Sequence, residues 1–414
     1  MAAGGATPRS ADMSGRPGLS RKMGMKRESR SQRTHMELKM AHSWVEIDLA
    51  ALRHNYSRAK ERLAPGSRIL GVVKSDAYGH GMIPVARELV ACGASFLAVS
   101  KHWEAVDLRA AGIRLPILCL LGVEPSEMAE AIRNEIRPVI YRIDHARRLS
   151  DTARSLNATA TVHVKLDTGM GRLGIPCRHL EAFLNELLTL PAIRLEGVLS
   201  HFASADEADK TSSTLQLTRF REAMALLSAR GLSVLGHIAN SAGLLDLPQA
   251  HFDLARPGIM LYGSPPSLEL HKPADLRPVM TFKSKIIQLK DVQAGQPIGY
   301  GGTFVTAAPG RIATIPVGYD DGYPRLLSNR GRVLVRGMSA PVVGRVSMNM
   351  ITADVTHIPS AREDDEVVLL GAQGTERVTA EEIAQLCGTI SYEIYCSIGR
   401  NRFKSFHNGI ANSN

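Results

Sequence analysis

The segment VVKSDAYGHG, residues 72–81, ends an apolar run and begins a turn that contains two glycines. The run from residue 69 to residue 73 predicts a buried strand, and the turn separates it from a helical segment. Lys74 is therefore expected at a strand end, where barrel enzymes keep reactive groups. A lysine whose stem is buried and whose amine faces a cavity loses proton affinity, so it can condense with an aldehyde or remove a proton. For Lys74 considered alone, a solvated lysine is the alternative.

Eight apolar runs of strand length alternate with helical segments over about 200 residues. The runs cover residues 69–73, 96–99, 116–121, 138–141, 161–166, 195–200, 236–239 and 254–262. Helical periodicity marks residues 85–90, 105–111, 180–188 and 220–227. The alternation predicts an α/β fold with a (β/α)8 TIM-type barrel, and an open doubly wound sheet is the alternative.

The helical period disappears beyond a polar stretch that ends at Pro278 and that we interpret as a linker. Short runs between glycine turns predict a mostly β C-terminal domain with one late helix at residues 380–386. These runs cover residues 282–289, 312–316, 332–335, 341–343 and 367–370. Since 414 residues exceed one ordinary core, we expect a leader over residues 1–42, a barrel over residues 43–275 and a β domain over residues 276–414.

The composition is typical of a globular protein, because 44% of the residues are hydrophobic. No apolar stretch reaches the ~18 residues that a membrane helix requires, so we expect a soluble protein without a membrane partner. The five cysteines form no C-x-x-C pair, which argues against a disulfide framework or a metal site. A reducing, cytoplasmic location is the simplest interpretation.

The formal charge of +10 is concentrated at the N-terminus, where the first forty residues carry nine Lys or Arg and three Asp or Glu. This leader lacks apolar periodicity, so we expect it to be disordered. It also lacks the apolar core of a secretory signal. A dispensable extension or an upstream-called start codon is the preferred interpretation, ahead of an organelle transit peptide. Nucleic-acid binding depends only on this leader, and we do not expect it.

A G-x-G-x-x-G motif occurs at residues 169–174, directly after a predicted strand. Such a motif can mark a dinucleotide site when it follows the first strand of a βαβ unit. Here it follows the fifth candidate strand, and no acidic residue suited to a ribose ends the following strand. We therefore reject the dinucleotide interpretation.

Two long motifs resemble those of alanine racemases. VVKSDAYGHG (72–81) resembles the segment that binds pyridoxal phosphate, and KLDTGMGRLG (165–174) resembles a segment near the substrate. Further matches are HFA (201–203), NSAG (240–243), RPGI (256–259), PVGYDDGYPR (316–325), VSMNM (346–350) and SYEI (391–394). The resemblance extends from about residue 43 to the C-terminus, in the order of the family.

The resemblance implies a pyridoxal 5'-phosphate-dependent isomerase that interconverts L-alanine and D-alanine. Lys74 would hold the cofactor covalently and act on the D side of the α-carbon, and Tyr319 would act on the L side with help from His201. Two bases are needed because one base that returns its own proton tends to retain configuration. In the family this tyrosine comes from the neighbouring subunit, which implies a head-to-tail homodimer. The resemblance further implies that the enzyme would supply D-alanine for peptidoglycan or would take part in alanine catabolism.

The resemblance also assigns the cofactor contacts. The phosphate contacts are Tyr78, Ser241, Gly258, Ile259 and Tyr392, His201 packs against the pyridine ring, and Arg256 faces the pyridine nitrogen. Because an arginine does not give up its proton, the ring stays uncharged and is a weaker electron sink. That favours racemisation over decarboxylation, the nearest enzymatic rival.

Arg172 and the backbone of Met348 match substrate contacts of the family. Lys165 matches a lysine that some members carbamylate, and an unmodified lysine in a charged layer is the alternative. Asn349 departs from the common pattern, which has Asp, so a charge near the substrate is lost. A racemase of broader amino-acid specificity and a non-catalytic pyridoxal-phosphate-binding protein are the remaining alternatives.

Overall fold

The computed structural model describes residues 42–271, 274–401 and 403–409, so the predictions for residues 1–40 lie outside the described residues. Eight parallel strands form the barrel sheet, in the order β10-β2-β3-β4-β5-β6-β8-β9. The strands are β2 (Arg68–Val72), β3 (Phe96–Val99), β4 (Ile117–Cys119), β5 (Ile136–Ile140), β6 (Ala160–Asp167), β8 (Ile193–Leu199), β9 (Leu235–His237) and β10 (Leu254–Ala255), and β7 (Ile175–Pro176) pairs with β6. Two backbone hydrogen bonds bring β9 and β10 together, from Asp253 to Gly236 and from Arg256 to Ala239. The predicted barrel is confirmed.

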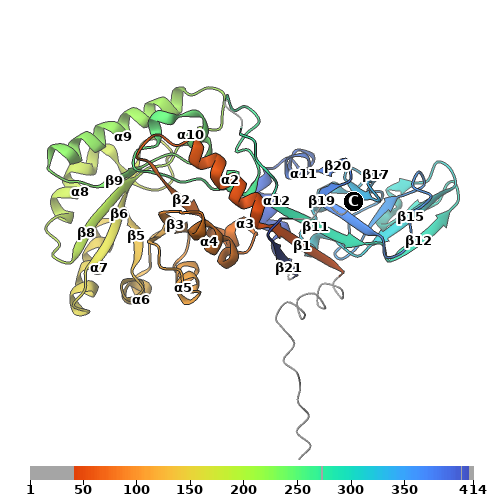
Figure 1. The fold of residues 1–414 in the computed structure, drawn as a ribbon, viewed down its shortest axis with the longest axis horizontal. Helices are drawn as coiled ribbons and strands as arrows, with labels where there is room; N and C mark the ends of the chain where they lie inside the picture. The colour runs from red at the N-terminus through yellow and green to blue at the C-terminus, as the bar shows by residue number, and fades with distance from the viewer. Residues whose placement is uncertain (1–41, 272–273, 402, 410–414) are drawn as a thin grey trace, which may run out of the picture. The chain divides into compact units, whose positions relative to one another are not determined.

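Helices cover the outside of this sheet (Figure 1). They are α2 (Leu49–Glu61), α4 (Met82–Ala91), α5 (His102–Ala110), α6 (Met128–Arg133), α7 (Ile143–Ser155), α8 (Leu180–Leu187) and α9 (Thr211–Ala229), whereas the short segments α3 (Lys74–Tyr78) and α10 (Ser241–Asp246) follow the carboxyl ends of β2 and β9. The strands β3 and β4 are buried at every position, which fits a parallel sheet that is covered on both faces. Asp48 caps α2, because its Oδ1 atom accepts hydrogen bonds from the backbone amides of Ala50 and Ala51.

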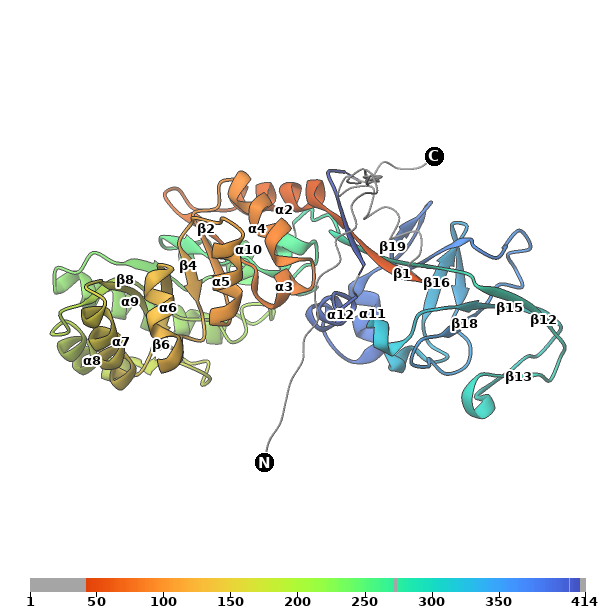
Figure 2. The same ribbon diagram turned by 90° about the horizontal axis from the view of Figure 1, so that it is seen from below.

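The C-terminal part is mostly β, as predicted (Figure 2). Its strands are β11 (Met280–Lys285), β12 (Gln288–Val292), β13 (Pro297–Ile298), β14 (Phe304–Val305), β15 (Gly310–Ile315), β16 (Arg332–Val335), β17 (Met338–Pro341), β18 (Ile351–Asp354), β19 (Glu366–Gln373), β20 (Glu376–Val378) and β21 (Lys404–His407). β1 (Ser43–Asp48) pairs with β11 and β21, so the first described strand shares a sheet with the C-terminal strands. The predicted boundary at residues 275 and 276 stays a prediction.

Four local predictions are wrong. The run at residues 341–343 is not a strand, because β17 ends at Pro341 and Val342 forms only an isolated bridge with Ala353. The run at residues 254–262 is a strand only to Ala255, because Pro257 and Gly258 interrupt it and Ile259–Tyr262 forms a 3-10 turn. Arg256 therefore follows a strand and does not lie within one. The run at residues 282–289 divides between β11 and β12, which belong to different sheets. The late helix at residues 380–386 is present as α11 (Ala380–Cys387), but a second helix, α12 (Ser391–Ile398), follows it.

No helix in the part of the chain that the structure describes is long and apolar enough to cross a membrane.

Candidate active site

One cavity of about 590 Å³ gathers residues from most of the sequence motifs. The predicted site residues that line it are Lys74, Tyr78, Lys165, Arg172, His201, Ser241, Arg256, Gly258, Ile259 and Tyr392. The barrel supplies the first nine, from segments at or near the carboxyl ends of its strands, where the active sites of such barrels lie. The last comes from α12, so a helix of the C-terminal part completes the cavity wall.

Lys74 begins one turn of left-handed helix. Residues 75–78 all have φ between +53° and +55°, a conformation that costs about 1–2 kcal/mol per non-glycine residue. Close packing behind the turn holds it in place: a Cβ on Gly79 would lie 2.4 Å from the carbonyl oxygen of Tyr395 and 2.8 Å from the Cα of Gly399. The turn therefore depends on α12, and it carries both Lys74 and Tyr78 into the cavity.

Glu104 joins this turn to the neighbouring βα loop. Its side chain is buried, with Oε1 accepting a hydrogen bond of 2.5 Å from the backbone of Ser75 and Oε2 accepting bonds from the backbone of Ser100 and Lys101. A buried carboxylate with three amide donors holds both loops at fixed positions. Burial, followed by the charge of Arg172, lowers the pKa of the Lys74 amine.

Tyr78, Ser241 and Gly258 form a close-packed cradle. A Cβ on Gly258 would lie 2.4 Å from the Tyr78 hydroxyl, so only glycine fits there. The amide of Gly258 donates a hydrogen bond of 2.9 Å to Ser241 Oγ. The ring of Tyr78 also lies 5.9 Å from the ring of Tyr392, measured between centroids. Hydroxyl groups together with backbone amides are what a phosphate group needs.

Arg256 is buried, and its terminal nitrogens are fully engaged. Nη1 donates to the carbonyl oxygen and the Nδ1 atom of His237, at 2.8 and 3.0 Å. Nη2 donates to Ser200 O at 2.6 Å and to His201 Nδ1 at 3.1 Å. Its Nε–H group makes no hydrogen bond to a described residue, so it is the donor left for a ligand. Burial lowers the pKa of Arg256 to about 10, which leaves it protonated at neutral pH.

The proton position and the charge of His201 depend on its contact with Arg256. Because a guanidinium has donors only, the Nδ1 atom of His201 accepts, and a neutral ring then carries its proton on Nε2. Burial and the nearby cations, Arg256 first, hold the pKa of His201 well below its ordinary value, which keeps the ring neutral. His201 is thus a hydrogen-bond donor on the wall of the cavity.

Lys165 lies among cations at the same cavity. Burial lowers its pKa to about 7, and the charges of Arg256, Arg172 and Lys74 act in the same direction. Near neutral pH a large share of its amine is therefore neutral. A neutral amine is nucleophilic, and an anion at this position would face three cations.

Tyr319 and Met348, two further predicted site residues, do not line the cavity at Lys74 of their own chain. They lie beside each other: the amide of Tyr319 donates to Ser347 O, and that of Asp320 donates to Met348 O. Tyr319 is 43% exposed and Met348 is 54% exposed, which is high for large apolar side chains. Asn349 is next to them, and its Nδ2 atom lies 3.4 Å from an oxygen of Asp320.

The cavity fits pyridoxal phosphate, which the sequence resemblance implies. An amine of lowered pKa suits the aldehyde, the glycine cradle suits the phosphate, and the Nε–H group of Arg256 is an unused donor for the ring nitrogen. Sequence reasoning missed other contributors, namely Glu104, the cavity-lining Cys396 and the histidine that contacts Arg256, His237. None of them belongs to a motif that indicates its role. The position of Glu104, an acidic residue shortly after a predicted strand, could have indicated a role at the site.

Comparisons with known proteins agree with this geometry. Residues 47–266 match the family model "Alanine racemase, N-terminal domain", and residues 279–406 match "Alanine racemase, C-terminal domain". An alanine racemase of Halothermothrix orenii is 45% identical over 369 residues, which cover 89% of this chain and 97% of that protein. The alanine racemase structure of Clostridium difficile 630 superposes with a TM-score of 0.84 at 37% identity, covering 90% and 98% of the two chains. A Bartonella henselae alanine racemase structure with covalently bound pyridoxal phosphate gives 0.80 at 29% identity, covering 89% and 100%.

Proposed function

Because the chain belongs to the alanine racemase family, we propose that the cavity at Lys74 is the site where it interconverts L-alanine and D-alanine. The enzyme is an isomerase that depends on pyridoxal 5'-phosphate. The observation that carries the proposal is the convergence of ten predicted residues from separate motifs on this one cavity. Relatives that are named alanine racemases do not favour a racemase of broader specificity or a non-catalytic carrier.

We assign the cofactor contacts to the cradle and to Arg256. Lys74 would hold the aldehyde end, Tyr78, Ser241, Gly258, Ile259 and Tyr392 would hold the phosphate, and the Nε–H group of Arg256 would donate to the ring nitrogen. When bound, pyridoxal phosphate withdraws electrons from the α-carbon of alanine and makes its proton more acidic. Because Arg256 keeps its proton, the ring nitrogen stays unprotonated, which favours brief proton removal and return.

Lys74 and Tyr319 of the partner subunit divide the proton transfer. Lys74, whose pKa is lowered, accepts and returns the proton on the D side, and the tyrosine does so on the L side. His201 assists the tyrosine, because its Nε2 atom carries the proton when Nδ1 accepts from Arg256. Arg172 and the backbone amide of Met348 bind the substrate carboxylate, the latter from the partner.

We propose a head-to-tail homodimer with shared active sites. The support is the exposure of the surface around Tyr319, where Leu326, Met348 and Met350 are 60%, 54% and 50% exposed. Large apolar side chains gathered on one exposed surface mark interfaces. Asn349 lies in this surface, so its lost charge affects rate and substrate preference more than reaction type. We further propose a cytoplasmic enzyme that supplies D-alanine for peptidoglycan or serves alanine catabolism.

Racemisation is tested most directly in heavy water. Purified protein with pyridoxal phosphate and L-alanine should lose optical activity while deuterium enters the α-position, because each base exchanges its proton with solvent. Polarimetry and mass spectrometry follow the two signals together. Deuterium entry with retained configuration would mean that the tyrosine removes and returns the proton without Lys74 acting as the opposite base. An absence of exchange, with cofactor visibly bound, would refute alanine as the substrate.

Carbamylation of Lys165 is the expected consequence of its low pKa. A neutral amine adds carbon dioxide, and the resulting anion is stabilised by Arg172, Arg256 and Lys74. Protein equilibrated with ¹³C-bicarbonate near neutral pH should show a carbamate signal in its ¹³C NMR spectrum. The signal should be absent from a Lys165→Met variant. An equal signal in both proteins would show that Lys165 is unmodified.

A further inference from the structure

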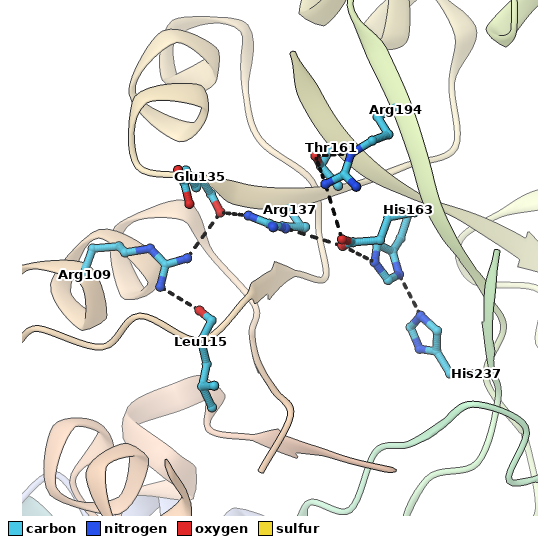
Figure 3. A network of polar contacts seen from close by, with 9 residues as sticks. Arg109, Leu115, Glu135, Arg137, Thr161, His163, Arg194 and His237 are labelled. Atoms are coloured by element: carbon cyan, nitrogen blue, oxygen red, sulfur yellow. Dashed lines mark hydrogen bonds and ion pairs between the residues drawn. The ribbon is translucent and has the colours of Figure 1, made fainter. Parts of the chain in front are cut away.

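Four polar side chains, Arg256, His237, His163 and Glu196, form a hydrogen-bonded relay in the barrel interior. The Nη1 atom of Arg256 lies 3.0 Å from His237 Nδ1, and His237 Nε2 lies 2.8 Å from His163 Nδ1. His163 Nε2 in turn lies 3.2 Å from an oxygen of Glu196. Figure 3 shows the contact between the two imidazole rings. Both histidines are fully buried, and they come from β6 and β9, while Glu196 comes from β8.

Only one set of proton positions allows all the hydrogen bonds of this relay to form when both imidazole rings are neutral. Because Arg256 can only donate, His237 Nδ1 must accept, so the proton of His237 is on Nε2. That proton points at His163 Nδ1, which must therefore accept, and the proton of His163 is on Nε2. It points at Glu196, which accepts. Every hydrogen bond runs in the same direction, from Arg256 to Glu196, and such aligned bonds strengthen one another.

The charges at the two ends complement each other. In the described part of the chain, no carboxylate forms an ion pair with Arg256, although its side chain is buried, and a buried charge is costly without compensation. The carboxylate at the other end, Glu196, is 16% exposed and is held by Arg137 at 3.4 Å and Arg194 at 3.6 Å. Figure 3 shows these two arginines and the backbone oxygen of Glu135, to which Arg137 also donates. The two histidines are the link between the carboxylate and the buried cation.

The neutral state of the rings agrees with their surroundings. Burial lowers the pKa of His163 although Glu196 acts against the shift, and burial together with Arg256 holds the pKa of His237 well below its ordinary value. Burial acts to raise the pKa of Glu196, but the hydrogen bond from His163 and the nearby cations bring it below its ordinary value. The relay therefore has two neutral imidazole rings between the Glu196 carboxylate and the Arg256 guanidinium.

We infer that Glu196, His163 and His237 are positioning residues that fix the orientation of the Arg256 guanidinium. With His237 and His201 as obligate acceptors, both terminal nitrogens of Arg256 are held, and its Nε–H group is left to face the ring of the cofactor. If His237 carried its proton on Nδ1, two donors would face each other, and the Nη1 atom of Arg256 would keep only its bond to the carbonyl oxygen of His237. The inference rests on the role proposed for Arg256, but the proton positions can be tested without it.

Neutron diffraction of perdeuterated protein tests the proton positions directly, with and without cofactor. Deuterium is expected on Nε2 of His237 and on Nε2 of His163, with none on Nδ1 of either ring. Deuterium on His237 Nδ1 in either form would refute the inference. A protein with the expected deuterium positions but no racemase activity would instead refute the proposed function and leave the relay intact.

The Glu196→Gln variant tests what the relay does. The amide of Gln can donate to His163 Nε2, which moves the proton of both histidines to Nδ1. The Nδ1 proton of His237 would then face the donor group of Arg256. We expect kcat to fall about tenfold with little change in KM, together with a shift in the absorption band of the bound cofactor. Glu196→Asp, which keeps the charge, should restore most of both. Wild-type kcat and absorption in Glu196→Gln would overturn the inference.

Glu88→Gln is the matched control. Glu88 is also 16% exposed and is also paired with an arginine, Arg53, but it lies on α4 outside the relay. It should keep the wild-type kcat and absorption band, and equal losses in both variants would refute a specific role for Glu196. If Glu196→Gln does not fold, the neutron experiment on the wild-type protein still decides.

Discussion

A Lys74→Ala variant is expected to lose racemase activity by about 10⁴-fold or more, because one side chain both holds the cofactor and acts as a base. The chemistry needs the amine at this one position, where burial and Arg172 lower its pKa and the left-handed turn aims it into the cavity. The measurement is the initial rate in both directions, from L-alanine and from D-alanine, with added pyridoxal phosphate. The covalent absorption band of the cofactor should disappear with the activity.

Two controls separate chemistry from folding. Added methylamine should restore part of the activity of Lys74→Ala, since a free amine can occupy the vacated space and accept a proton. Lys285→Ala, which removes a lysine paired with Asp364 in the C-terminal part, should keep the wild-type rate. Retention of more than a small fraction of the activity by Lys74→Ala, without added amine, would contradict the assignment of the base.

A Tyr319→Ala variant should be nearly inactive alone, by about 10²–10⁴-fold, and should regain activity when it is mixed with Lys74→Ala. The reason is the proposed shared site, which is supported by the 43% exposure of Tyr319 and by its absence from the lining of the Lys74 cavity of its own chain. In a mixed dimer one site receives Lys74 from one subunit and Tyr319 from the other, whereas the second site lacks both. Random mixing of the two variants should therefore restore roughly a quarter of the wild-type activity.

The subunit exchange has its own controls. Mixing Tyr319→Ala with a Tyr319→Phe variant should restore nothing, because no dimer of these two contains an intact site. Dilution of the wild-type enzyme should lower its specific activity in parallel with dissociation, measured by sedimentation. Complementation that fails while dimers demonstrably exchange would contradict a shared site, and full activity in monomers would do the same.

Much of the site was predictable from short motifs. Lys74 and His201 each follow an apolar run, and the carboxyl ends of parallel strands meet at one end of a barrel. The alternation of strands and helices was therefore enough to predict that these groups meet. The left-handed turn was not predictable, since periodicity carries no sign of φ for residues other than glycine, and the turn is held by contacts with α12.

The local errors have a common physical origin. The sequence of α12, SYEIYCSI, contains β-branched and aromatic residues that favour strands, and only packing against the barrel makes it a helix. The run at residues 254–262 is mostly apolar, but hydrophobicity does not distinguish a buried strand from a buried 3-10 turn. In both places the hydrophobic pattern alone does not decide between a strand and another buried structure.

The amino-acid sequence by itself determined the fold class and the family and predicted the reacting groups, because these follow from periodicity and from motifs of neighbouring residues. Only the tertiary structure decided which groups support them. Glu104 reaches the turn at Ser75 from another loop, and His163 contacts His237 across 74 positions of sequence. Tyr319, in contrast, lies away from the cavity of its own chain. The physical reason is that a hydrogen bond depends on distance in space, and no local pattern records which distant residues the barrel brings within 3 Å of one another.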